Sequence, residues 1–128
     1  MTRKLNRILA VDDEEFIRQL LADFLSLQGY DVQTAASGEQ ALEVIAAMQP
    51  QLVIMDIKMP GLNGLDVMRR IKATHKDVGV IMLSAFGDSA TIQEAYRQGA
   101  DFYLQKPVNL DRLQDMLHAW QRGPQEDH

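Results

Sequence analysis

Five short strand-like runs alternate with five helical patterns along the chain, and this alternation limits its possible folds more than any other feature. The runs cover Arg7–Val11, Asp31–Ala35, Leu52–Met55, Val78–Leu83 and Phe102–Gln105. The third and fourth runs lack polar alternation, which is typical of parallel strands covered on both faces. The pattern therefore predicts an α/β fold of (βα)₅ type, a doubly wound parallel sheet with helices on both faces.

The first helical pattern follows the Arg7–Val11 run. Its apolar residues recur at i, i+4, i+5, i+8 and i+9, which predicts one buried stripe made of Phe16, Leu20, Leu21, Phe24 and Leu25. Gly29 follows as a left-handed residue that ends the helix. We expect this stripe to pack against the sheet.

The other helical patterns carry recognisable start signals. Ser37 and Gln40 form a capping box, in which each side chain satisfies the backbone N–H of the other residue. A third helix is expected to start near Gly64 and a fourth to run from about Asp88 to Gln98. Asn109 caps the last helix, whose apolar stripe comprises Leu110, Leu113, Leu117 and Trp120.

The length and composition indicate one domain. The 128 residues predict a single folded unit over residues 1–121, with 122–128 as a polar tail or the start of a linker. No Cys is present, which excludes a disulfide framework and Cys-based chemistry and fits a cytoplasmic location. No apolar run approaches a membrane span, and the net charge of −5 disfavours direct nucleic acid binding.

Polar residues follow four of the predicted strands. Asp12 and Asp13 come after the first strand, Asp56 after the third, Ser84 after the fourth and Lys106 after the fifth. The carboxyl ends of parallel strands meet at one edge of a sheet, which is where such folds bind ligands. Single positions of this kind are often helix caps or surface lysines, but five together at one edge predict a functional site.

Charge balance predicts the cation that such a site takes. Three neighbouring carboxylates cannot all stay ionised without compensation. Mg²⁺ and Lys106 together would balance Asp12, Asp13 and Asp56, and Mg²⁺ favours carboxylate oxygens while keeping several waters. The cluster contains no His or Cys, so zinc is disfavoured.

Through these residues and the segments around them, the chain resembles the response regulator receiver family of two-component signalling. The matching segments are Val11–Glu14, Met55–Gly64, Leu83–Ala85 and Gly99–Pro107, and the resemblance runs from Ile8 to about Trp120. It implies a flavodoxin-like sheet of order 2-1-3-4-5. It also implies a cis peptide bond between Lys106 and Pro107.

The resemblance implies a role for each acidic position. Asp56 would be the phospho-acceptor. Asp13 and Asp56 would bind Mg²⁺ directly, with Mn²⁺ as an acceptable substitute. The backbone carbonyl of Lys58 would be a third ligand, and Asp12 would act through metal-bound water.

The resemblance also implies roles in phosphoryl binding and switching. Lys106 would pair with the acceptor and then with a phosphoryl oxygen, while Ser84 would bind another oxygen. The backbone N–H groups of Lys58 and Ala85 would complete the cradle. Ser84 and Tyr103 would move together and reshape the face formed by the fourth helix, fifth strand and fifth helix.

The function implied is phosphorelay signalling. A sensor histidine kinase or histidine phosphotransfer protein would supply the phosphoryl group, and an output domain or downstream protein would read it. The domain would catalyse its own phosphorylation and dephosphorylation without being a conventional enzyme. Lys58 and Phe86 would tune water access to the phosphoryl group. Phe16–Leu20 and the neighbouring loop after the fifth strand would select the kinase, and phosphorylation-dependent homodimers would form on the fourth-helix face.

Three alternatives compete with this interpretation. A haloacid-dehalogenase-type phosphatase needs an acid/base Asp two residues after its nucleophile, where Lys58 stands here. A flavodoxin needs a Ser/Thr- and Gly-rich phosphate loop, whereas Val11–Glu15 is acidic. An inactive pseudo-receiver that serves only as an interaction module stays open.

Overall fold

The computed structural model describes residues 2–85, 87 and 89–123. Along the chain it contains β1 (Arg7–Val11), α1 (Glu15–Leu27), β2 (Asp31–Ala35), α2 (Gly38–Met48), β3 (Leu52–Asp56), α3 (Gly64–Thr74), β4 (Gly79–Ser84), α4 (Ser89–Arg97), β5 (Phe102–Gln105) and α5 (Leu110–Arg122). The predicted alternation of strands and helices is therefore confirmed. Phe86, the expected helix start at Asp88 and residues 124–128 of the expected tail lie outside the described residues.

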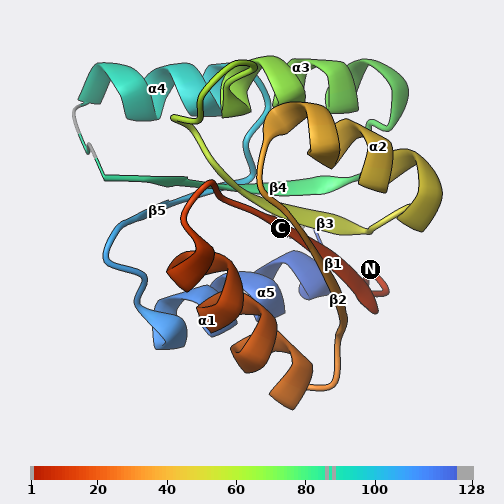
Figure 1. Cartoon of the computed structure of the whole chain (residues 1–128). Helices are drawn as coiled ribbons and strands as arrows, with labels where there is room; N and C mark the ends of the chain where they lie inside the picture. Colours follow the sequence, from red (N-terminus) through yellow and green to blue (C-terminus); the bar gives the residue numbers. More distant parts are fainter. Residues whose placement is uncertain (1, 86, 88, 124–128) are drawn as a thin grey trace, which may run out of the picture.

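The five strands form one parallel sheet in the order β2-β1-β3-β4-β5. Helices α2, α3 and α4 cover one face of this sheet, and α1 and α5 cover the other (Figure 1). The doubly wound fold and the strand order are both confirmed. The order makes β1 and β3 neighbours at the centre of the sheet, whereas β5 lies at an edge beyond β4.

The central strands are apolar on both sides because both faces of the sheet are covered. In β4, Val80 and Met82 belong to the core beneath α2, α3 and α4, while Ile81 and Leu83 belong to the core beneath α1 and α5. All four side chains are fully buried. Successive side chains of a strand point to opposite faces, so a strand of this kind can carry a polar residue only near its end.

One expectation about the core was wrong. Phe16 does not belong to the buried stripe of α1 and is 74% exposed. The buried positions are Ile17, Leu21 and Leu25, which recur every four residues. Phe16 and Ile17 are adjacent, and neighbouring residues on a helix point about 100° apart, so only one of them faces the sheet.

The helix ends largely follow the predicted signals. Ser37 Oγ accepts the backbone N–H of Gln40 at 3.1 Å, but the Gln40 side chain accepts from Ala36, at 2.7 Å, rather than from Ser37. Asn109 caps α5, and Gly29 adopts the expected left-handed conformation with φ +96°. The expected cis peptide bond between Lys106 and Pro107 is present.

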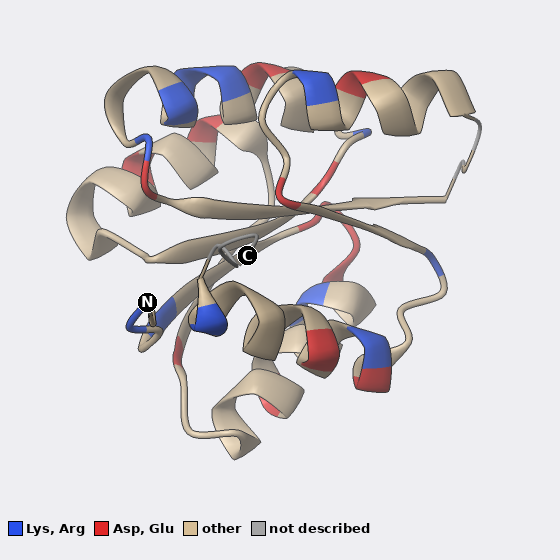
Figure 2. Ribbon diagram, turned by 180° about the vertical axis from the view of Figure 1, so that it is seen from behind, with Lys and Arg blue, Asp and Glu red and all other residues tan. Residues whose placement is uncertain are grey.

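The polar residues singled out in the sequence lie at the carboxyl edge of the sheet. Asp12 follows β1 directly, and Lys106 follows β5 directly. Asp56 and Ser84 are the final residues of β3 and β4, so each strand ends one residue later than expected. Figure 2 shows acidic stretches after the central strands, on the same side of the sheet as the basic position that follows β5.

Candidate functional site

Three carboxylates share one ammonium group at the carboxyl edge of the sheet. Lys106 Nζ lies 2.9 Å from Asp12 Oδ2, 2.9 Å from Asp56 Oδ2 and 3.1 Å from Glu14 Oε1. The lysine side chain is only 11% exposed. Its backbone N–H donates to the carbonyl of Ser84 at 2.8 Å, which ties the end of β5 to the end of β4.

Backbone hydrogen bonds fix the two buried carboxylates. Asp12 Oδ1 accepts from the N–H of Glu14 at 2.9 Å, and Asp56 Oδ1 accepts from the N–H of Lys58 at 3.1 Å. In each carboxylate the remaining oxygen is the one near Lys106. Arg18 Nη1 also donates to the carbonyl of Asp12 at 2.8 Å, which secures the turn between β1 and α1.

Burial and charge oppose each other in this cluster. Burial raises the pKa of the Asp12 carboxyl, although hydrogen bonds from Lys106 and Glu14 pull it down. Burial alone would lower the pKa of Lys106, but its hydrogen bonds to Asp12 and Asp56 outweigh burial and raise it. The ammonium therefore stays charged at neutral pH, and the pocket still favours additional positive charge.

The donor set fits a hard divalent cation. Asp12, Asp13, Glu14 and Asp56 each offer one carboxylate oxygen, and these oxygens lie within 4.8 Å of one another. Asp12 Oδ2 is buried, and the Lys106 ammonium at 2.9 Å is its charge partner among the described residues. Four carboxylates against one ammonium leave a surplus of negative charge, and oxygen ligands of this kind suit Mg²⁺.

The chain after Asp56 packs closely against the start of α3. The N–H of Gly64 donates to the carbonyl of Ile57 at 2.8 Å. A Cβ at Gly64 would lie 2.2 Å from the backbone oxygen of Asp56, so only glycine allows this approach. Gly64 is the first residue of α3, which agrees with the helix start expected there.

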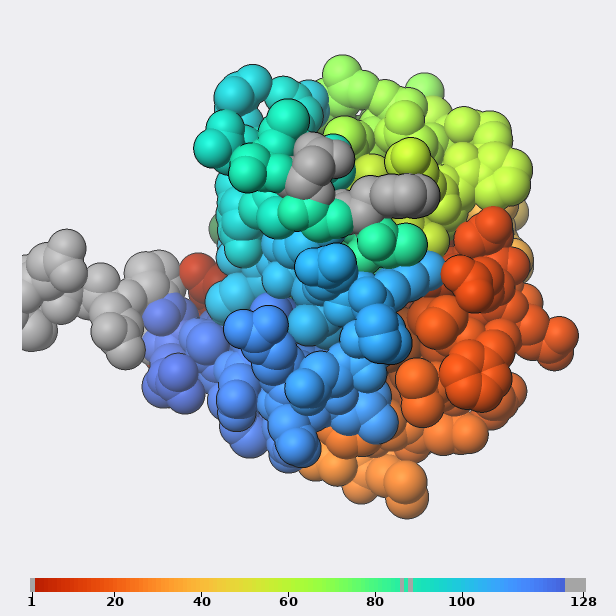
Figure 3. All heavy atoms as spheres, turned by 90° about the vertical axis from the view of Figure 1, so that its left-hand side faces the viewer, coloured from red at the N-terminus to blue at the C-terminus, as the bar shows by residue number. Residues whose placement is uncertain are grey.

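The remaining expected site residues lie around the same edge. Ser84 is buried at the end of β4, and Ala85 is exposed next to it. Tyr103 lies in β5 opposite Met82 and is partly buried against the core beneath α2, α3 and α4. Figure 3 views this side of the molecule, where the segments after β1, β3 and β5 come together.

Sequence reasoning assigned no role to Glu14, although its carboxylate is the third acceptor for Lys106. Glu14 is exposed and directly precedes α1. Its position immediately after Asp12 and Asp13 was the available signal. Its reach to Lys106, 92 residues later, was not visible in the sequence pattern.

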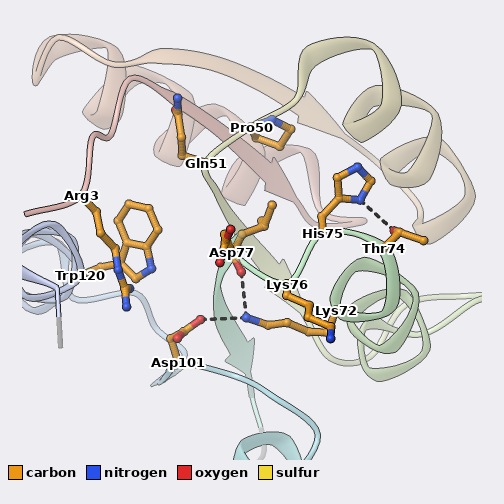
Figure 4. Close-up of a pocket in the computed structure, with 11 residues that line it drawn as sticks. Arg3, Pro50, Gln51, Lys72, Thr74, His75, Lys76, Asp77, Asp101 and Trp120 are labelled. Atoms are coloured by element: carbon orange, nitrogen blue, oxygen red, sulfur yellow. Dashed lines mark hydrogen bonds and ion pairs between the residues drawn. The ribbon is translucent and has the colours of Figure 1, made fainter.

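A cleft of about 650 Å³ lies at the opposite, amino-terminal edge of the sheet (Figure 4). Several of its polar groups already have partners. Lys72 donates to Asp101 and to the carbonyl of Val78, and the Arg3 guanidinium lies over the Trp120 ring at 5.0 Å. The acidic cluster, not this cleft, therefore has the chemistry of a reactive site.

None of the helices in the described part of the chain combines the length and apolarity needed to cross a bilayer.

Comparison with known proteins agrees with this geometry. The profile of the response regulator receiver domain matches residues 8–118. This chain belongs to the response regulator receiver family. As a receiver domain it takes part in two-component signalling, in which such domains work with histidine kinases and output domains. Receiver domains generally bind Mg²⁺ at an acidic site, and the cluster around Asp56 has that character.

Individual relatives support the assignment. The chain is 37% identical over 114 residues to sporulation initiation phosphotransferase F of Bacillus subtilis, covering 89% of this chain and 92% of that protein. It is 37% identical to response regulator MprA of Mycobacterium leprae, covering 94% of this chain and 53% of MprA. The receiver domain thus spans nearly all of one relative and about half of the other.

A solved structure extends the likeness to the fold. A chain in the crystal structure of the CheX–CheY–BeF3–Mg²⁺ complex from Borrelia burgdorferi superposes with a TM-score of 0.85 at 26% identity. The match covers 90% of this receiver and 88% of that chain.

Proposed function

We propose that this receiver accepts a phosphoryl group on Asp56 from a phosphohistidine of a sensor histidine kinase or histidine phosphotransfer protein. An oxygen of the Asp56 carboxylate attacks phosphorus while the P–N bond of the phosphohistidine breaks. The electron pair passes to the imidazole nitrogen, which takes up a proton. The observation that carries the proposal is that Lys106 Nζ lies 2.9 Å from both Asp12 Oδ2 and Asp56 Oδ2.

Phosphoryl transfer requires positioning and neutralisation of charge more than it requires covalent chemistry. In the proposal Lys106 neutralises the acceptor and then a phosphoryl oxygen. Mg²⁺, or Mn²⁺ in its place, supplies further neutralisation of the phosphoryl oxygens when bound. Asp13, Asp56 and the carbonyl of Lys58 would hold the ion, and Asp12 would contact it through water. The CheX–CheY complex from Borrelia burgdorferi, which includes both BeF3 and Mg²⁺, supports this assignment by likeness.

The remaining phosphoryl contacts come from the ends of β3 and β4. The Ser84 hydroxyl and the N–H groups of Lys58 and Ala85 are proposed to bind phosphoryl oxygens. Movement of Ser84 would be accompanied by Tyr103, whose strand pairs with β4. The signal would then leave through the face formed by α4, β5 and α5, as a two-state equilibrium biased by the new contacts.

The donor is proposed to dock on α1. Phe16 is 74% exposed and Leu27 is 85% exposed, and both lie on this helix. They are eleven residues apart, which is about three helical turns, so they share one side of the helix. An exposed aromatic beside an acidic pocket is a natural anchor for a helical partner. Docking there would bring a phosphohistidine to the edge that carries Asp56.

The domain is proposed to act as a switch in the cytoplasm rather than as a conventional enzyme, because the transferred phosphoryl group stays covalently bound to Asp56. MprA is about twice the length of the matched segment, which supports control of an output domain or a separate downstream protein. Phosphorylation-dependent homodimers through the α4 face, and tuning of the phosphoryl lifetime by Lys58, are further parts of the proposal.

Two measurements test the proposal. Beryllofluoride with Mg²⁺ should shift the backbone NMR signals of Asp13, Ser84 and Tyr103. Radiolabelled phosphoryl should pass from a phosphorylated histidine kinase to the wild-type protein and not to Asp56→Asn. An unshifted spectrum together with no transfer would favour the pseudo-receiver alternative. Equal labelling of Asp56→Asn would show that Asp56 is not the acceptor.

A further inference from the structure

Several hydrogen bonds hold the loop of residues 57–63, which joins β3 to α3. Its first residue, Ile57, donates its N–H to the carbonyl of Leu83 at 2.9 Å, which extends the pairing with β4. Near its start the N–H of Lys58 donates to Asp56 Oδ1 at 3.1 Å. At its end the N–H of Gly64 donates back to the carbonyl of Ile57 at 2.8 Å. Between these points the N–H of Leu62 donates to Glu39 Oε1 at 3.0 Å. The contact with Glu39 ties the loop to α2, which is neither of the two elements that the loop joins.

The contact with Glu39 depends on close packing between the first turn of α2 and the loop. A Cβ at Gly38 would lie 2.5 Å from the carbonyl oxygen of Leu62. A Cβ at Gly61 would lie 3.0 Å from Glu39 Oε1, and Gly61 has a φ of +76° that disfavours other residues. Two glycines therefore let the backbone of α2 approach the loop closely enough for the carboxylate to reach Leu62.

Glu39 is suited to hold the loop through its charge. Hydrogen bonds from its own backbone N–H and from Leu62 hold the pKa of Glu39 below its ordinary value. The carboxylate is therefore ionised at neutral pH, and a charged acceptor strengthens a hydrogen bond to an N–H group. The positive charge of Arg70 on α3 also lowers the pKa of Glu39, by a smaller amount.

We propose that Glu39 is a positioning residue for the phosphorylation site. By holding Leu62 it fixes the loop that follows Asp56 and carries Lys58, whose carbonyl is the proposed third ligand of Mg²⁺. Loss of this contact loosens the loop and weakens both Mg²⁺ binding and retention of the phosphoryl group. This inference rests on the proposed function, because it assigns Glu39 to the same site.

The test compares Glu39→Ala and Glu39→Gln with Glu43→Ala, which removes an exposed carboxylate one turn further along α2. Mg²⁺ is titrated while backbone NMR signals are followed, and decay of labelled phosphoryl is timed. Glu39→Ala should shift the Leu62 and Lys58 signals without Mg²⁺. It should also weaken Mg²⁺ binding about fivefold, because the loop loses a charged hydrogen-bond acceptor. Glu39→Gln keeps an acceptor oxygen and should restore affinity to within about twofold of wild type.

The outcomes separate positioning from simple stabilisation. If Glu39→Ala lowers the thermal midpoint but binds Mg²⁺ as Glu43→Ala does, Glu39 is structural only and the inference is wrong. A Glu39→Gln variant as weak as Glu39→Ala would also overturn it. If the wild type takes up no phosphoryl label, the proposed function fails, while the Mg²⁺ titrations still decide the role of Glu39.

Discussion

Lys106 Nζ lies 2.9 Å from Asp56 Oδ2, although 50 residues separate them in the chain. Asp56 ends β3 and Lys106 follows β5, and β4 lies between these strands in the sheet. The lysine therefore reaches across one strand to neutralise the acceptor. It contacts Asp12 in the same way, so one cation compensates two buried carboxylates.

Replacing Lys106 with methionine is expected to destabilise the receiver most when Mg²⁺ is absent. The substitution leaves Asp12 and Asp56 buried without their cation, and breaking a buried pair of this kind costs about 3 kcal/mol. Urea denaturation should show this loss without Mg²⁺ and a clearly smaller loss in excess Mg²⁺. Exposed Lys76→Met is the control, and a loss independent of Mg²⁺ would contradict the expectation.

Asp13→Asn is expected to stabilise the metal-free protein and to weaken Mg²⁺ binding. Asp13 is exposed and its carboxylate lies in a cluster of four, so removing its charge relieves repulsion by roughly 1 kcal/mol. Mg²⁺ affinity should fall at least about tenfold, because a proposed ligand loses its charge. Glu15→Gln makes the same charge change outside the cluster, and an equal effect there would show that only net charge matters.

Phe16→Ala is expected to slow phosphoryl transfer from the cognate histidine kinase by about tenfold, as for an aromatic anchor at an interface. The rate with a small donor such as acetyl phosphate should stay unchanged, because Phe16 does not contribute to the acidic cluster. Exposed Phe16 should affect the unfolding free energy by no more than about 0.5 kcal/mol. Tyr96→Ala, 47% exposed on α4, is the control, and equal slowing in both variants would exclude a docking role specific to Phe16.

The contact between Glu39 and Leu62 is expected to survive mild acid. The pKa of Glu39 is lowered from an ordinary value of 4.5, so the folded state binds its proton less tightly than the unfolded state. Its contribution to stability is complete above pH 4.5 and is lost as the pH falls through the lower folded value. The Leu62 amide shift, followed by NMR, should titrate with a midpoint below 4.5, and a midpoint above it would contradict the assignment.

The sequence was sufficient to predict the fold and the edge at which the site lies. Strands without polar alternation predicted a parallel sheet with helices on both faces. In such a sheet, polar residues that follow the strands lie together at the carboxyl edge. The same pattern could not distinguish Phe16 from Ile17, because both are apolar and adjacent and only packing against the sheet selects one. It also placed the ends of β3 and β4 one residue early.

Contacts between distant segments were the other part that the pattern missed. Glu14 meets Lys106, and Glu39 meets Leu62, because particular loop conformations bring them together. Neither loop conformation follows from the spacing of residues. The close approaches at Gly38 and Gly61 that allow the second contact are likewise visible only in three dimensions.

The edge position of β5 has a consequence for how the chain emerges during its synthesis. Asp12, Asp13, Glu14 and Asp56 all leave the ribosome before Lys106 does. A nascent chain that ends before β5 would bring those carboxylates together with no lysine to offset them. Addition of β5 brings Lys106, which supplies the positive charge, and also gives β4 its second hydrogen-bonded neighbour. Both contributions favour the complete five-stranded sheet over a chain that ends before β5.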